Sequence, residues 1–164
     1  MELKGALVLV ASIVAAAAYG QLSPADGAFL KGATEGNRGE VLLGRLAARK
    51  GASEDIRKFG QKMVWDHSKA LAQVTRLAYD KKVTVPTRPK AEDRELHRRL
   101  SLLRGIEFDR AYKKAMIEDH RMDVAEFQRE STRGRDRDVR DWAKKTLPTL
   151  RMHLDMIQSA RVGR

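Results

Sequence analysis

The sequence predicts an all-α protein, built as an antiparallel four-helix bundle. Its 164 residues contain only 4 prolines and are rich in Leu, Ala, Lys, Arg, Glu and Asp. No segment alternates apolar and polar residues between turn residues, as a β-strand would. Apolar residues instead recur at spacings of three and four, which is the period of a helix with one buried face. A chain of this length is the size of one domain, so a single fold must carry the function.

Capping residues and helix breakers divide the chain into four long helices and one short helix. Ser23 and Pro24 begin the first helix, Gly51 ends it, and Ser53 begins the second. Pro86 and Pro89 keep residues 83–91 extended, which is enough chain to cross one end of a bundle. The expected helices are 24–50, 54–82, a short helix 92–103 on the crossover, 106–131, and 138–160 with a kink at Pro148.

The first twenty residues have the features of a secretory signal peptide. A short n-region that includes Lys4 precedes an apolar segment of about 13 residues and Gly20, after which we expect cleavage. A transmembrane helix needs roughly 20 apolar residues. We expect residues 21–164 to form the mature domain, exported across the inner membrane to the periplasm or cell envelope. A retained anchor is the alternative, because Glu2 offsets Lys4.

The chain has no cysteine and a net charge of +11. Without cysteine there is no disulfide and no thiol nucleophile, and a metal site must use nitrogen and oxygen ligands. Lys and Arg are spread over every predicted helix, which is typical of a solvated surface, although anionic lipids or polymers of an envelope would attract it. Glycine-rich phosphate loops, G-x-S-x-G and H-E-x-x-H motifs are missing, and no feature indicates specific nucleic-acid binding.

One segment of the second long helix recurs in the third. The pattern F-x-x-x-M-V-x-D-H at residues 59–67 matches Y-x-x-x-M-I-x-D-H at residues 112–120. This internal match suggests a two-fold arrangement, although a general pattern of buried helical positions accounts for part of it.

Each long helix turns one ionisable residue toward the predicted core. The apolar stripes place Glu40, His67, His120 and His153 inward, with Asp123 on the same stripe as His120. Their distances from the two tight turns differ by about one helical turn, so all five can converge on one site. Asp66 and Asp119 each precede a histidine and point about 100° away, as partners that orient ligands or pair with arginine.

Burying these groups unpaired would cost several kcal/mol each, so they must be neutral, paired, or bound to a cation. Imidazole and carboxylate ligands suit Fe, Mn, Zn or Cu, in a site held by Glu40, His67, His120, Asp123 and His153. The alternative is a polar cluster that fixes the register of the helices and binds nothing. His97 is surrounded by charged residues and is expected at the surface.

Four ordered motifs together resemble one family. They are N-x-x-E-V-x-L-G (37–44), M-V-x-D-H (63–67), M-x-x-D-H-x-x-D-V-x-x-F (116–127) and T-L-P-x-L-x-x-H-L (146–154). The chain resembles the exported bacterial ferritin-like proteins grouped as domain of unknown function DUF4142, from about residue 25 to residue 160. The resemblance implies a ferritin-like bundle in the envelope or periplasm. It does not indicate any particular biochemical activity.

We therefore expect an exported protein that binds a metal ion at the Glu/His cluster, with a stress role as one candidate and no enzymatic activity. A ferritin-like oxidoreductase is the weaker, enzymatic alternative, because the chain lacks the E-x-x-H pairs of carboxylate-bridged di-iron sites. The alternative from another class is an envelope interaction module with a basic surface and a purely structural inner cluster. The sequence does not settle the oligomeric state.

Overall fold

A computed structural model describes residues 22–163, which contain five α-helices and no strand. The prediction of an all-α protein is confirmed, and every predicted helix boundary agrees to within about two residues. The predicted signal peptide, residues 1–20, lies outside the described residues. No helix in the described range is long and apolar enough to cross a membrane. The helices are α1 (Pro24–Lys50), α2 (Glu54–Asp80), α3 (Ala91–Leu102), α4 (Gly105–Arg133) and α5 (Arg137–Ser159).

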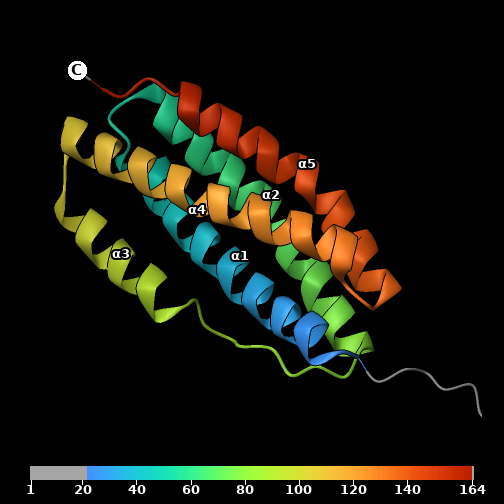
Figure 1. The fold of residues 1–164 in the computed structure, drawn as a ribbon. Helices are drawn as coiled ribbons and strands as arrows, with labels where there is room; N and C mark the ends of the chain where they lie inside the picture. The colour runs from blue at the N-terminus through green and yellow to red at the C-terminus, as the bar shows by residue number, and fades with distance from the viewer. Residues whose placement is uncertain (1–21, 164) are drawn as a thin grey trace, which may run out of the picture.

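The four long helices lie side by side, and α3 lies on the outside of this group (Figure 1). Helix α1 packs along α2, and α4 packs along α5, so each pair forms a helical hairpin. The hairpins meet at two seams, where α2 contacts α5 and α1 contacts α4. From its length, we expected the segment after α2 to cross one end of the group. It runs instead along the side of the group to α3 (Figure 1). A hydrogen bond from Arg38 Nε to Pro86 O, at 3.2 Å, holds it against α1.

Helix starts follow the capping residues. Ser23 Oγ accepts a hydrogen bond from Asp26 N at 3.1 Å, and Ser53 Oγ accepts from Ile56 N at 3.2 Å. Asp136 caps α5 by accepting from the backbone of Asp138 and Val139. These contacts satisfy amides that no helical carbonyl can reach, which is why the three helices begin where the sequence predicted.

Two turns are held by aspartates from the opposite hairpin. Asp109, at the start of α4, accepts from Ala52 N and Ser53 N in the α1–α2 turn, both at 2.8 Å. Asp26, at the start of α1, accepts from the backbone nitrogens of residues 135 and 136 in the α4–α5 turn, both at 3.0 Å. The hairpins therefore clasp each other at both ends in the same way, which fixes their lengthwise register.

The apolar core is divided into two clusters. One surrounds Phe59, Tyr112 and Ile157 near the α1–α2 turn, and the other surrounds Phe29 and Trp142 near the α4–α5 turn. Buried polar residues occupy the level between these clusters. The residues of this polar layer are Asn37, Glu40, His67, His120 and His153.

Candidate metal centre

Three histidine side chains from three helices meet in the polar layer. The ring centroids lie 5.1 Å apart for His67 and His153, 5.5 Å for His120 and His153, and 5.9 Å for His67 and His120. All three are at most 3 % exposed. One nitrogen of each ring lies within 4.8 Å of the other two, a spacing that permits a shared metal ion. The structure thus brings these three predicted site residues together.

An oxygen atom contacts one nitrogen of each imidazole from outside the histidine trio. Glu40 Oε2 lies 2.7 Å from His67 Nδ1, and Asp66 Oδ2 lies 2.7 Å from His153 Nε2. The carbonyl oxygen of Met116 lies 3.0 Å from His120 Nδ1. The hydrogen-bond partners of these outer nitrogens are the oxygens of Asn37, Asp66 and the Met116 carbonyl, so the ring protons belong at the outer positions. The opposite nitrogens, His67 Nε2, His153 Nδ1 and His120 Nε2, then carry free lone pairs.

Two of these lone pairs face each other closely. His67 Nε2 and His153 Nδ1 are 3.2 Å apart. Burial lowers the pKa of both residues to about 4, and burial with the two neighbouring imidazoles lowers the pKa of His120 to about 3. The rings are therefore neutral at pH 7, and two lone pairs at this distance repel. Nitrogens about 2.0–2.1 Å from a tetrahedral ion stand roughly 3.3 Å apart, so a metal ion would relieve this repulsion.

Glu40 carries an unsatisfied oxygen into the same layer. Its Oε1 has no hydrogen-bond partner and lies 3.6 Å from His120 Nε2, which also has none. Burial raises the pKa of Glu40 well above its ordinary value, and the neighbouring Asp119 and Asp93 carboxylates raise it further. Buried polar atoms without partners are rare, because each forfeits the hydrogen bonds that water would give.

The aspartates of the predicted site take different places. Asp66 contacts His153, as expected of a residue that orients a ligand. Asp119 lies closer to the cluster than its helical position suggested, with one oxygen within 4.8 Å of ligand atoms of both Glu40 and His120. Asp123 lies near Glu40, whose negative charge adds to burial in raising the pKa of Asp123. All seven predicted residues therefore lie in the cluster or against it.

Two contributors were not predicted from the sequence. Asn37, one helical turn before Glu40, places Oδ1 3.0 Å from His67 Nδ1. Asp93 reaches the cluster from α3 and packs directly against Gly39. The position of Asn37 on the same helix face as Glu40 is a signal that could have identified it. No sequence signal places Asp93, because the path of the crossover determines its position.

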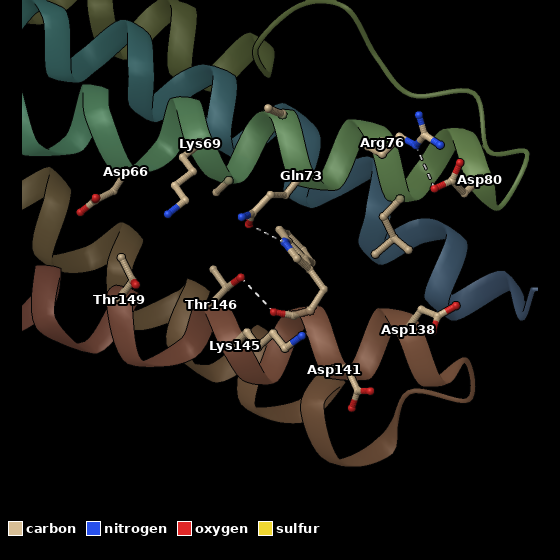
Figure 2. A pocket seen from close by; sticks show the side chains of 14 residues that line it. Asp66, Lys69, Gln73, Arg76, Asp80, Asp138, Asp141, Lys145, Thr146 and Thr149 are labelled. Carbon is tan, nitrogen blue, oxygen red and sulfur yellow. Dashed lines mark hydrogen bonds and ion pairs between the residues drawn. The ribbon is translucent and has the colours of Figure 1, made fainter.

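Two hollows flank the cluster. A groove of about 810 Å³ runs between α2 and α5, with Asp66 at one end and Asp80 and Asp138 at the other (Figure 2). Since Asp66 also accepts a hydrogen bond from His153, it connects this groove to the histidines. On the other side, a cavity of about 10 Å³ is bordered by α1, α2, α4, α5 and Lys90. This volume is close to the minimum that holds one water molecule.

The chain belongs to the DUF4142 family, a domain of unknown function, whose family model matches residues 11–160. The resemblance noted from the four motifs is thus confirmed. Among solved structures, the chain is similar to the crystal structure of a DUF305 fragment from Deinococcus radiodurans, with a TM-score of 0.73 and 14 % identity over 85 % of this chain and 96 % of that chain. At this identity the likeness concerns the fold alone. No curated protein matches the chain.

Proposed function

We propose that this protein binds one transition-metal ion through His67 Nε2, His120 Nε2 and His153 Nδ1. The observation that carries the proposal is the arrangement of the imidazoles: an oxygen atom contacts the outer nitrogen of each ring, which leaves the inner nitrogens facing one another as available ligands. Metal-binding histidines are commonly oriented in this manner.

The donor set and charges suit a divalent ion. Three neutral imidazoles suit Zn or Cu(II), and also Fe or Mn when oxygen ligands complete the site. A divalent ion adds two positive charges to the core. The carboxylates of Glu40 and Asp66, each 2.7 Å from a ring nitrogen, can balance them. A site of three imidazoles leaves a further position that water can fill.

The wider role we propose is metal binding in the bacterial envelope, with a stress function as one candidate and no catalysis. Export rests on the signal-like residues 1–20. The finer fold description, a ferritin-like four-helix bundle, is part of the same proposal. It is supported by two antiparallel hairpins joined through a lengthwise crossover.

Elemental analysis of untagged protein tests the metal site. We expect about one equivalent of Zn²⁺ or Cu²⁺ to remain bound after dialysis, and the double variant His67→Ala, His120→Ala to retain none. The matched control is His97→Ala, which removes the histidine that lies in α3 outside the cluster. Equal metal content in the double variant and the wild-type protein would refute the proposal.

The net charge of +11 supports a second candidate, an interaction module for anionic envelope lipid or polymer in which the inner cluster is only structural. Sedimentation with vesicles containing anionic lipid should then show binding that weakens as salt is added. Absence of binding, or binding indifferent to salt, would exclude this candidate.

A further inference from the structure

A second set of ligand atoms lies beside the histidine trio, at the seam between α1 and α4. Glu40, Asp119 and His120 each offer one atom within 4.8 Å of the others. This set shares only His120 with the histidine trio. Its other members are carboxylates, which are the ligands preferred by hard divalent cations.

The two sets lie on different sides of the His67 ring. Glu40 Oε2 contacts Nδ1 of His67, whereas the inner face of the trio uses Nε2 on the other side of that ring. The two nitrogens of an imidazole point in diverging directions, so an ion bound at His67 Nε2 lies beyond the reach of Glu40 Oε2. His120 Nε2 can bind one ion at a time. With the histidine position filled, the carboxylates remain as a separate group.

Several acidic side chains lie close together in this second set and around it. Asp123 lies near Glu40, and Asp93 adds a further carboxylate from α3. Burial raises the pKa of Asp119 to about 6, with Asp93 contributing, and burial with Glu40 and Asp119 raises the pKa of Asp123 well above its ordinary value. Glu40 Oε1 is buried and has no hydrogen-bond partner. A bound cation would satisfy this oxygen and neutralise its neighbours.

Space and a counter-charge are present beside Glu40 and Asp123. The cavity of about 10 Å³ is lined by Glu40 and Asp123, and also by Gly36, where an added Cβ would meet nothing within 4 Å. Lys90 lines the cavity too, and its positive charge lowers the pKa of Glu40, Asp119 and Asp123. Because Lys90 is exposed, its ammonium group can act as a counter-ion to these carboxylates and move aside into solvent when a cation binds.

We propose that Glu40 Oε1, Asp119 and Asp123 form a second cation position, suited to a hard divalent ion such as Mn²⁺, and that Lys90 balances their charge when the position is empty. The inference rests on the proposed function, because the histidines must hold their own ion for this position to be a second one.

The experiment starts from protein loaded with one equivalent of Zn²⁺, to which Mn²⁺ is added while free Mn²⁺ is measured by electron paramagnetic resonance. We expect the wild-type protein to bind one further Mn²⁺. The variant Asp119→Asn, Asp123→Asn should bind Mn²⁺ about tenfold more weakly or worse and hold Zn²⁺ as before. Glu118→Gln, at an exposed position of the same helix, is the matched control and should behave as wild type.

The outcomes separate the two proposals. Zn²⁺ retention by the double variant also shows that it is folded. If the Zn²⁺ protein binds no Mn²⁺, or if the double variant binds it as tightly as the wild type, the second position is refuted and the histidine site stands. If the wild-type protein binds no Zn²⁺, both proposals fall.

Discussion

Asp66 and Asp119 hold the same place in the repeated D-H motif, but their carboxylates lie in opposite environments. Asp66 borders the open groove between α2 and α5, where it contacts His153 and, at 3.0 Å, Lys62 Nζ. Although burial raises its pKa, these two hydrogen bonds outweigh burial and lower the pKa overall. Burial raises the pKa of Asp119 to about 6, and Asp93 adds to the rise.

The difference comes from what covers each seam. Helix α3 and its crossover lie against α1 and α4, and they bring Asp93 and Lys90 to that seam. No helix of the described residues covers the α2–α5 seam, whose groove is drawn in Figure 2. An identical local motif therefore yields an ion-paired carboxylate with a lowered pKa in one place and a carboxylate with a raised pKa in the other. The neighbours of a motif decide its electrostatic role.

The largest effect is expected from the histidines between the two seams, when metal-free protein is acidified. The folded-state pKa values of about 4, 3 and 4 for His67, His120 and His153 lie below the ordinary value of 6.5. Below pH 6.5 the unfolded chain therefore binds protons that the folded chain does not. The free energy of unfolding should therefore be highest above pH 6.5 and fall by roughly several kcal/mol as the pH drops toward 4.

Urea unfolding across this pH range measures the effect. The slope should be steepest for the wild-type protein and shallower in His153→Gln, which removes one of the three groups. The His97→Ala control should keep the wild-type slope. A stability that is flat between pH 6.5 and pH 4 would show that the buried rings take up protons without cost, contrary to the comparison.

The next largest effects are changes in stability of opposite sign when Asp66 and Asp119 are each replaced by asparagine. Asp66→Asn removes a carboxylate whose ionised form the fold favours, so metal-free protein should lose about 1 kcal/mol of stability at pH 8. Asp119→Asn removes a carboxylate with a raised pKa. The stability linked to such a group is present at low pH and lost as pH rises through about 6, so the variant should gain about 1 kcal/mol at pH 8.

Chemical denaturation of both variants beside the wild type, at pH 8 and again near pH 5, gives the readout. The gain of Asp119→Asn should shrink at the lower pH, where the wild-type aspartate is more fully protonated. If both variants changed the free energy of unfolding in the same direction, the two seams would not differ electrostatically.

The smallest effect concerns the space at the covered seam. Gly36→Ala adds a methyl group that meets nothing within 4 Å, so the usual helical advantage of alanine should stabilise the protein by about 0.5–1 kcal/mol. Gly60→Ala is the contrasting variant, because its Cβ would stand 2.6 Å from Ala48 N where α1 and α2 meet. The midpoint temperature of thermal unfolding should rise for Gly36→Ala and fall for Gly60→Ala. A lower midpoint for Gly36→Ala would mean that the cavity has no room for the added methyl group.

The sequence was sufficient to predict the helices and the convergence of the inner polar residues. Caps such as Ser23 and Ser53 act within one turn, so local sequence determines where helices begin. The inward positions of Glu40 and the three histidines follow from helical periodicity, and their convergence follows from distances to the tight turns that differ by only about one helical turn. Both arguments depend only on local geometry and short connections.

Other features depended on contacts distant in sequence. Asp119 was expected to point away from the cluster, but the adjacent α1 brings Glu40 within its reach. Asp93 was absent from the prediction because an extended crossover can take many paths, and only packing against α1 selects one. The choice of imidazole nitrogen was also beyond sequence, since it depends on acceptors from three different helices.

The clasps made by Asp26 and Asp109 restrict how this chain can change in length. Each ties the start of one helix to the turn of the opposite hairpin, so the rings stand between two fixed points. Inserting a single residue between a clasp and a histidine would shift that ring by about 1.5 Å and rotate it by about 100°. Insertions and deletions in relatives of this protein should therefore occur mainly in the crossover before α3, whose length does not set the position of any of the three rings.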